Sequence, residues 1–252
     1  MYSDFLPFAR ALADAAAGIV LPRYRSRLRV MRKSDSSPVT EADREAEMEM
    51  RTLIAGEFPD HGILGEEFGE TRQDAEFVWV LDPIDGTKSY IAGSPLFGTL
   101  IALLHRGHPV LGIIDHPALG LRVAAADGHV DVNGTPARMR AIASIADATM
   151  LTTDHTGICA WKKRDGFDRL ASSVALYRTW GDCYGYTQLA SGFADIMIDP
   201  IMSPWDTMAL IPVIEGAGGI ITSWEGGDPL ASNSIVAASP ALHAEVIRAL
   251  NE

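Results

Sequence analysis

Two stretches near the start of the chain carry apolar residues at helical spacing. The first predicts a helix that stops near Pro22, and the second predicts a helix that begins at Thr40 and ends near Phe58 and Pro59. The polar segment 33–40, which contains a proline, predicts a loop between them. The apolar positions of the first helix are Phe5, Phe8, Leu12, Ala16, Ile19 and Val20, and those of the second include Ala46, Met50, Leu53 and Ile54.

Short apolar runs replace the helical pattern after residue 60. Residues 61–70 predict a loop, and the apolar run 77–81 predicts a strand that leads directly into the hexapeptide DPIDGT at 82–87. Residues 97–126 contain three β-like runs with short turn signals between them, which predict an antiparallel meander. Asn133 and Gly134 mark a further turn.

The second half of the chain has a different order of elements. From about residue 145, strand-like runs at 148–154 and 193–199 are followed by helix-like runs at 204–218 and 240–250. This succession favours an α/β layered second half. No internal repeat or flexible linker separates it from the first half. We therefore expect an α+β half at 1–140 and an α/β half at 141–252, packed closely as one functional unit.

The composition is that of an ordinary globular protein, with 252 residues of which 47% are hydrophobic and 21% charged. The formal net charge of −12 disfavours nucleic acid and anionic membranes as partners. The basic segment 23–33 is interpreted as a solvated surface or a local edge that faces phosphate. Two cysteines, Cys159 and Cys183, fit neither a disulfide framework nor a zinc pattern and predict free thiols.

The N-terminal segment predicts an amphipathic helix and not a signal peptide, because it lacks a basic start. No run approaches 18 uninterrupted apolar residues, so we expect no membrane span. Together with the free thiols, these features predict a cytoplasmic protein.

The segment DPIDGT carries the clearest chemistry. A hydrophobic strand delivers Asp82 at its end, Pro83 is expected to end the strand ladder, and Asp85 follows. Gly86 permits a close backbone approach, and Thr87 can begin a helix whose free N–H groups suit a phosphate. Two carboxylates beside such a helix start predict a site for a metal and a phosphate, and hard oxygen ligands suit Mg²⁺ or Mn²⁺.

Electrostatic repulsion supports the metal. Two unit charges about 4 Å apart at an effective dielectric near 20 repel by roughly 4 kcal/mol. The repulsion among four clustered carboxylates would thus offset much of the free energy of unfolding of a typical protein, which is about 5–15 kcal/mol. Either cations hold the carboxylates together or the carboxylates stay apart.

Three short motifs in a fixed order resemble the inositol monophosphatase family: GEE at 65–67, DPIDGT at 82–87 and WD at 205–206. The similarity extends over nearly the whole chain. It implies the layered αβαβα sandwich of the inositol monophosphatase and sugar phosphatase fold, and a Mg²⁺-dependent phosphomonoesterase that forms a homodimer. The segments DPIDGTKSY, GIIDHP and WGDCY look most like the histidinol-phosphate phosphatase branch, since typical inositol enzymes carry another residue where Lys88 stands.

The resemblance also implies roles for single residues. Two to three Mg²⁺ ions, for which Mn²⁺ can substitute, would be held by Glu66, Asp82, the carbonyl of Ile84, Asp85 and Asp206. The attacking water would be oriented by Asp43 and Thr87 with support from Glu67. The phosphate would lie on the amides of Gly86 and Thr87 near Lys88, and the alcohol part of the substrate would lie near Asp182 and Asp199.

Several of these residues have simpler interpretations. Thr40 and Asp43 match a helix capping box, so Asp43 can cap, act in catalysis or do both. Asp206 favours a helix start, and Lys33 is either a surface charge or a cation near the metal. The seven histidines show no metal-type pairing.

The substrate is the most open question. The leading hypothesis is hydrolysis of L-histidinol phosphate in histidine biosynthesis. The nearest alternative is hydrolysis of inositol monophosphate or another small sugar phosphate. A more remote alternative is a regulatory protein-binding factor of the same family.

Overall fold

The computed structural model describes residues 1–26, 30–32 and 38–252. Most of the polar segment between the first two long helices, Lys33 included, lies outside the described residues. Two antiparallel strands flank it, β1 (Val30–Arg32) and β2 (Pro38–Thr40).

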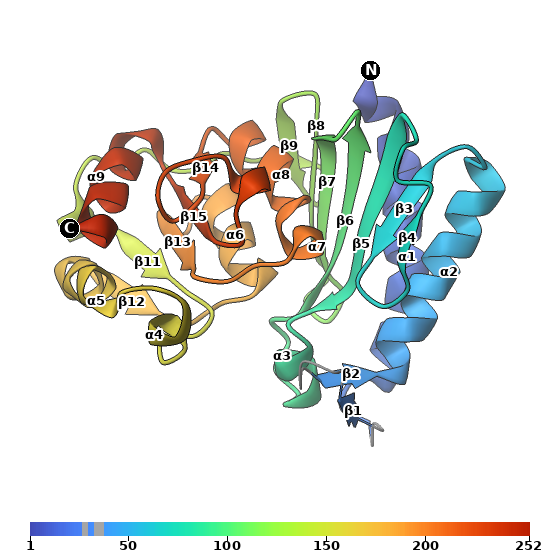
Figure 1. The fold of residues 1–252 in the computed structure, drawn as a ribbon, viewed down its shortest axis with the longest axis horizontal. Helices are drawn as coiled ribbons and strands as arrows, with labels where there is room; N and C mark the ends of the chain where they lie inside the picture. Colours follow the sequence, from blue (N-terminus) through green and yellow to red (C-terminus); the bar gives the residue numbers. More distant parts are fainter. Residues whose placement is uncertain (27–29, 33–37) are drawn as a thin grey trace.

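A large sheet of eight strands forms the centre of the first half (Figure 1). All neighbouring strands in it are antiparallel except β3 and β5, which are parallel. In spatial order its strands are β10 (Thr135–Pro136), β9 (His129–Val132), β8 (Leu121–Ala126), β7 (His108–His116), β6 (Gly98–His105), β5 (Phe77–Asp85), β3 (Gly62–Gly65) and β4 (Gly69–Thr71).

A second, five-stranded sheet lies in the other half. Strand β11 runs parallel to β12 and β13, whereas β15 runs antiparallel to β13 and β14. In spatial order these strands are β12 (Leu176–Arg178), β11 (Thr149–Leu151), β13 (Ile196–Asp199), β15 (Ile235–Ala238) and β14 (Ile220–Thr222).

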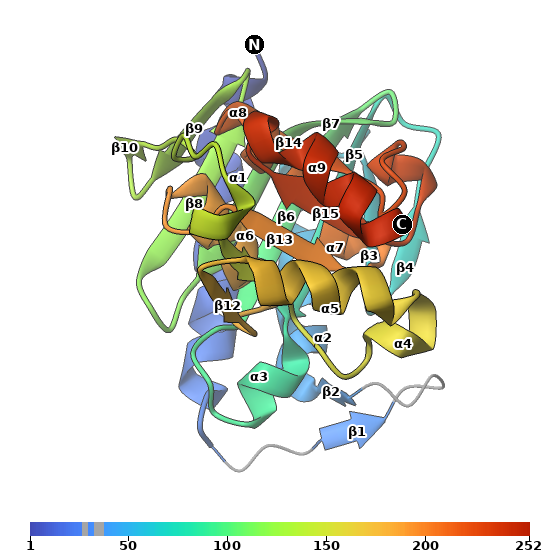
Figure 2. The same cartoon turned by 90° about the vertical axis from the view of Figure 1, so that its left-hand side faces the viewer.

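Helices cover both sheets and separate them. Helices α1 (Leu6–Val20) and α2 (Glu41–Glu57) pack on the outer face of the large sheet, and α6 (Cys183–Ala190) and α8 (Leu210–Gly216) lie between the sheets. Helices α5 (Arg164–Ser173) and α9 (Pro240–Asn251) pack on the far face of the small sheet (Figure 2). The short helices are α3 (Thr87–Ile91), α4 (Ile158–Trp161), α7 (Pro204–Thr207) and the 3₁₀ turns Tyr2–Phe5, Leu21–Arg23, Ile145–Asp147 and Pro229–Ala231. The expected five-layer αβαβα sandwich is confirmed.

Strand β5 shows how the layers are held together. Val78 and Val80 point into the core between the two sheets, whereas Trp79 and Leu81 point into the core under α1 and α2. Successive side chains of a strand alternate between faces, and both faces here are covered. A strand that is buried on both sides is apolar at successive positions, as residues 77–81 of β5 are.

Helix α1 with its flanking 3₁₀ turns, Tyr2–Arg23, meets the length and hydropathy criterion for a membrane span, with a mean hydropathy of 1.4. A core helix passes the same criterion. Its residues Ala9, Leu12, Ala16 and Val20 are fully buried in the core that α1 shares with α2 and the large sheet. We therefore assign α1 to the protein core.

Most predicted elements are confirmed, including the two N-terminal helices and the antiparallel meander β6–β7–β8. Asn133 and Gly134 form the predicted turn, with φ values of 50° and 81°. Such a pair of positive φ values matches the right-handed twist of the hairpin strands. The helices α5 and α6 were not among the predicted elements.

Three predictions about local structure are wrong. Residues 61–70 form the hairpin β3–β4 and not a loop, because β3 pairs in parallel with β5. The ladder between β5 and β6 does not end at Pro83: it skips residues 83 and 84 in a bulge and resumes where Asp85 pairs with Gly98. The predicted helix 204–218 is divided into α7 and α8, since Pro212 has no N–H to donate to the carbonyl of Met208.

Candidate active site

The bulge at the end of β5 positions two aspartates. Asp82 is buried, and its Oδ1 accepts a hydrogen bond from the amide of Ile84 at 3.0 Å. Thr99 Oγ1 on β6 donates to the carbonyl of Pro83 at 2.8 Å, which holds the irregular backbone against the neighbouring strand. The bulge turns Asp82 and Asp85 toward the same side of the strand end.

A third aspartate comes from the other half of the chain. Asp206 lies in the first turn of α7, where its carboxylate accepts from the amide of Ser203 at 2.7 Å. The carboxylates of Asp82, Asp85 and Asp206 each offer an oxygen, and these oxygens lie within 4.8 Å of one another. The structure thus brings together three of the predicted metal ligands.

The electrostatics of this cluster fit a divalent cation. Burial, and then the negative charges of Glu66, Asp85 and Asp206, hold the pKa of Asp82 well above its usual range. Burial likewise raises the pKa of Asp206 to about 7. Buried like charges destabilise one another unless a cation compensates them. Hard oxygen donors at this spacing suit Mg²⁺, so the residues present fit the metal.

The tip of the β3–β4 hairpin carries Glu66 and Glu67 and is held by a residue that the sequence analysis did not identify. The fully buried carboxylate of Glu47 on α2 accepts from the amides of Glu67 at 2.7 Å and Phe68 at 3.2 Å. Arg51 Nε donates to the same carboxylate at 2.8 Å. In the sequence, Glu47 and Arg51 look like an ordinary i,i+4 pair of a surface helix.

The GEE motif at 65–67 begins with a glycine because there is no space for a side chain at position 65. A Cβ at position 65 would clash with Oε1 of Glu47. The glycine therefore lets the hairpin tip approach α2 closely. From this tip the amide of Glu66 donates to the carbonyl of Leu81 at 3.2 Å, which places Glu66 beside the end of β5.

Asp43 forms the predicted capping box and also lies near enough to Glu66 to feel its negative charge. Its carboxylate accepts from the amide of Thr40 at 2.8 Å and from the Thr40 hydroxyl at 2.5 Å. Burial raises the pKa of Asp43 to about 6, and the negative charge of Glu66 contributes in the same direction. Both interpretations of Asp43, the structural cap and the site residue, are compatible with this position.

Gly86 and Thr87 lead from β5 into α3. Gly86 has a φ of 78°, a conformation that only glycine adopts readily, and a Cβ there would lie 2.6 Å from Oδ2 of Asp182. Thr87 Oγ1 donates to the carbonyl of Ile84 at 3.2 Å. The hydroxyl of Thr87 and the carbonyl of Ile84 are thus neighbours, as the proposed roles of both residues require.

Helix α6 docks on the end of β5. The amide of Cys183 donates to Asp85 at 2.5 Å, and Ser89 Oγ donates to Asp182 at 2.8 Å. A Cβ at Gly98 would lie 2.6 Å from the sulfur of Cys183, so the glycine makes room for α6. Burial holds the pKa of the Cys183 thiol well above its usual range, which leaves it protonated and supports a structural role.

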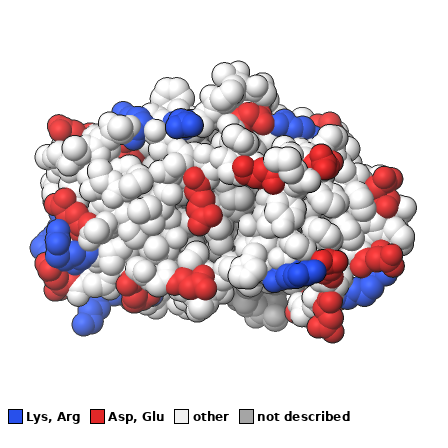
Figure 3. Space-filling model, turned by 90° about the horizontal axis from the view of Figure 1, so that it is seen from above, with Lys and Arg blue, Asp and Glu red and all other residues white. Residues whose placement is uncertain are grey.

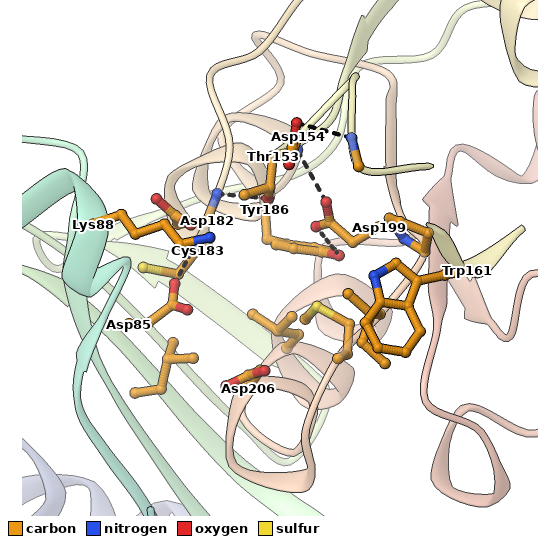
Figure 4. Close-up of a pocket in the computed structure, with 16 residues that line it drawn as sticks. Asp85, Lys88, Thr153, Asp154, Trp161, Asp182, Cys183, Tyr186, Asp199 and Asp206 are labelled. Atoms are coloured by element: carbon orange, nitrogen blue, oxygen red, sulfur yellow. Dashed lines mark hydrogen bonds between the residues drawn. The ribbon is translucent and has the colours of Figure 1, made fainter. Parts of the chain in front are cut away.

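A cavity of about 320 Å³ opens beside the carboxylate cluster (Figure 4). Five predicted site residues line it: Asp85, Lys88, Asp182, Asp199 and Asp206. Among the other lining residues, Thr153, Asp154, Trp161 and Tyr186 carry polar or aromatic groups and were not predicted from the sequence. Thr153 and Asp154 end the predicted strand-like run 148–154 but lie beyond β11, and Trp161 and Tyr186 lie on the short helices α4 and α6. No motif marked any of the four as a site residue.

Asp199 lies deep in the wall of this cavity. It is 3% exposed, and its two carboxylate oxygens accept from the amide of Thr153 and from the hydroxyl of Tyr186, both at 3.0 Å. Burial raises the pKa of Asp199 to about 6. Its hydrogen bonds are therefore directed at the protein.

The fold and the site together define a class of protein. A five-layer αβαβα sandwich, with a partly buried carboxylate cluster at a strand end and a small cavity beside it, is the architecture of a metal-dependent phosphomonoesterase. The whole chain, residues 1–252, matches the inositol monophosphatase family, and the protein belongs to this family. The resemblance inferred from the GEE, DPIDGT and WD motifs is confirmed.

Named relatives include phosphatases of two kinds. The chain is 42% identical to the chloroplastic bifunctional phosphatase IMPL2 of Arabidopsis thaliana, over 93% of this chain and 69% of that protein. It is 40% identical to a histidinol-phosphatase of Chlorobaculum parvum, over 97% and 96% of the two chains. A solved inositol monophosphatase from Zymomonas mobilis is 37% identical, with a TM-score of 0.88 over 100% of this chain and 99% of that chain.

Proposed function

We propose that this protein hydrolyses L-histidinol phosphate to L-histidinol and inorganic phosphate. The observation that carries the proposal is the charge of the cavity, in which five aspartates and one lysine surround the place of the substrate. Histidinol carries an ammonium and an imidazole that is partly protonated near neutral pH, whereas inositol offers only neutral hydroxyls. The 40% identity to a histidinol-phosphatase over nearly the full length supports the same substrate.

The metal would be held by the residues at the end of β5 and their neighbours. The proposed ligands are Glu66, Asp82, the Ile84 carbonyl, Asp85 and Asp206, for two to three Mg²⁺ ions that Mn²⁺ can replace. When bound, such ions lower the pKa of water, neutralise phosphate oxygens and stabilise a leaving alkoxide.

The remaining chemistry belongs to residues around this cluster. We assign Asp43 and Thr87, with support from Glu67, to orienting the attacking water and receiving its proton. The amides of Gly86 and Thr87 and the side chain of Lys88 bind the phosphate. Phosphate monoesters hydrolyse extremely slowly without help, so orientation and charge stabilisation together account for the activity.

Asp182 and Asp199 are proposed to recognise the alcohol part of the substrate. Asp182 lies next to Gly86 and therefore next to the phosphate position. Asp199 acts through the residues that it holds, Thr153 and Tyr186. The phosphate end is common to all candidate esters, so the choice between them depends on this side of the cavity.

The test compares kcat/KM for L-histidinol phosphate and myo-inositol 1-phosphate in the wild type, Asp182→Asn and Asp199→Asn. We expect the wild type to prefer the histidinol ester and Asp182→Asn to reduce that preference about 10-fold or more, since a charged hydrogen bond contributes roughly 1.5–3 kcal/mol. Asp199→Asn should reduce the preference indirectly, because the Asp199 carboxylate holds Thr153 and Tyr186 in the cavity wall. A wild-type preference for the inositol ester would favour the alternative, a general sugar-phosphate phosphatase.

We further propose that the protein acts in the cytoplasm as a homodimer and that its halves, 1–140 and 141–252, form one catalytic unit. The acidic balance of the chain supports a small-molecule substrate and not nucleic acid. On the face shown in Figure 3, the basic side chains are scattered among acidic and uncharged ones. Light scattering coupled to gel filtration measures the oligomeric state, and a monomeric mass would refute the dimer.

A further inference from the structure

We propose that Asp154 and Trp161 form a subsite for the imidazole ring of the substrate and thereby select histidinol phosphate over smaller amino-alcohol phosphates. This inference rests on the proposed function. It adds a role for two residues that no sequence motif pointed to, at the end of the cavity away from the carboxylate cluster.

The loop before α4 presents Asp154 with one oxygen available. Asp154 Oδ1 accepts from the amide of Thr156 at 3.0 Å, from its hydroxyl at 2.8 Å and from the amide of Gly157 at 3.1 Å. Oδ2 accepts no hydrogen bond from any described residue. The side chain is exposed and lines the cavity, so its carboxylate is fixed in place by one oxygen and open to a ligand through the other.

Trp161 ends α4 and faces the same cavity. Its side chain is 58% exposed, and within the described part of the chain the indole has no aromatic or cationic partner. Contact between the apolar surface of an exposed indole and water is unfavourable. A ligand that covers the ring therefore gains free energy by removing this surface from water. A flat, partly cationic imidazole fits such a surface by stacking and by cation–π attraction.

Asp154 and Trp161 lie on the part of the cavity wall that is remote from Asp85. In the view of Figure 4, Asp85 is at the left and Asp206 below, whereas Asp154 is above and Trp161 at the right, with Asp199 between these two. In histidinol phosphate the ammonium is on the second carbon from the ester oxygen, and the imidazole is one carbon farther. With the phosphate near Gly86, the ammonium lies near Asp182 and the imidazole reaches toward Asp154.

The charges near Asp154 favour a protonated imidazole. Lys88 faces both acids, since its positive charge contributes to lowering the pKa of Asp154 and opposes the rise in the pKa of Asp182. The main cause for Asp154 is its hydrogen bond from Thr156, which keeps the carboxylate ionised. Two carboxylates against one lysine leave a net negative charge on this side of the cavity, and Asp199 directs its oxygens into the protein.

A comparison of two esters isolates the contribution of the imidazole ring to recognition. L-Histidinol phosphate and L-alaninol phosphate share the phosphate and the ammonium and differ only in the ring. We expect Asp154→Asn to lower kcat/KM for the histidinol ester about 10- to 100-fold and Trp161→Ala to lower it about 3- to 30-fold. For the alaninol ester, the decrease in kcat/KM should be much smaller. Trp161→Phe should retain part of the kcat/KM for the histidinol ester that Trp161→Ala loses.

Exposed residues of the same types outside the cavity give matched controls, namely Asp147→Asn and Trp180→Ala. Circular dichroism and the melting temperature establish that each variant is folded, and Asp154→Asn keeps Oδ1 as an acceptor for the loop. The subsite is refuted if Asp154→Asn and Trp161→Ala lower kcat/KM equally for the two esters, or lower it no more than the control variants do. The proposed function would still stand in that case. If the wild type hydrolyses other phosphomonoesters but not histidinol phosphate, the proposed function itself fails.

Discussion

The carboxylate of Asp85, at the end of the large sheet, accepts a hydrogen bond from the amide of Cys183, which is 98 residues later and begins α6. The contact joins a candidate metal ligand to the wall of the substrate cavity. It requires the close approach that Gly98 permits. The candidate site is therefore complete only when the two halves of the chain are docked.

Replacing Asp82 with Asn should abolish activity and stabilise the metal-free protein. The pKa of Asp82 is raised by burial and by neighbouring acids, so its charge destabilises the fold at neutral pH when no cation is present. Without metal the variant should melt at a higher temperature than the wild type. Mg²⁺ should raise the melting temperature of the wild type more than that of the variant, and chelation should abolish wild-type turnover.

The exposed Asp74 provides the control for this experiment. Asp74→Asn should keep both the activity and the response to Mg²⁺. Full turnover of the chelator-treated wild type, or near wild-type activity of Asp82→Asn, would contradict the metal assignment.

Replacing Thr87 with Ala should reduce kcat and leave KM nearly unchanged. The hydroxyl is adjacent to the Ile84 carbonyl and is proposed to orient the water, an effect felt in the transition state. We expect a loss of about 100-fold, in the range of general acid–base contributions. Thr87→Ser keeps the hydroxyl and should retain most of the activity. A rise in KM alone would make Thr87 a binding residue.

Replacing Glu47 with Ala should destabilise the protein by about 2–4 kcal/mol, because two backbone amides and Arg51 lose a buried acceptor. The hairpin tip that carries Glu66 should loosen, so the affinity for Mg²⁺ should also fall. Glu49→Ala, an exposed position on the same helix, is the matched control. Urea unfolding and Mg²⁺ titration measure both effects, and equal behaviour of the two variants would refute the role of Glu47.

His116 should make the protein less stable in mild acid. Burial lowers the pKa of His116 from 6.5 to about 4, while its ring contacts the Phe97 carbonyl and the Thr187 hydroxyl. Below pH 6.5 the unfolded chain binds a proton that the folded chain rejects. Stability is therefore lost as the pH falls from 6.5 toward 4, by roughly 3 kcal/mol in total.

The measurement compares urea unfolding between pH 7 and pH 4.5 for the wild type and His116→Asn. The variant should be less stable at pH 7 but should lose less stability on acidification. The exposed His129→Asn should follow the wild type. Identical pH slopes in the wild type and His116→Asn would contradict this prediction.

Several elements could be predicted from the amino-acid sequence, because their signals lie within the element itself. Periodicity predicted α1, α2 and the meander β6–β7–β8, because the buried face of a long helix or strand repeats with the period of its backbone. The capping box of Thr40 and Asp43 was predictable for the same reason, since both partners lie within one turn. The order of the GEE, DPIDGT and WD motifs was enough to indicate the family.

Contacts between side chains far apart in the sequence could not be predicted, because they depend on how distant elements pack. The hairpin β3–β4 forms because β5 offers a parallel partner, and Glu47 acts at its tip because α2 passes within contact of Gly65. Likewise, the placing of Asp154 and Trp161 in the same cavity as Asp85 and Asp206 depends on how the small sheet packs against the large one. No residue's own neighbours in sequence encode such contacts, because their free energy comes from surfaces that are brought together only when the whole chain has folded.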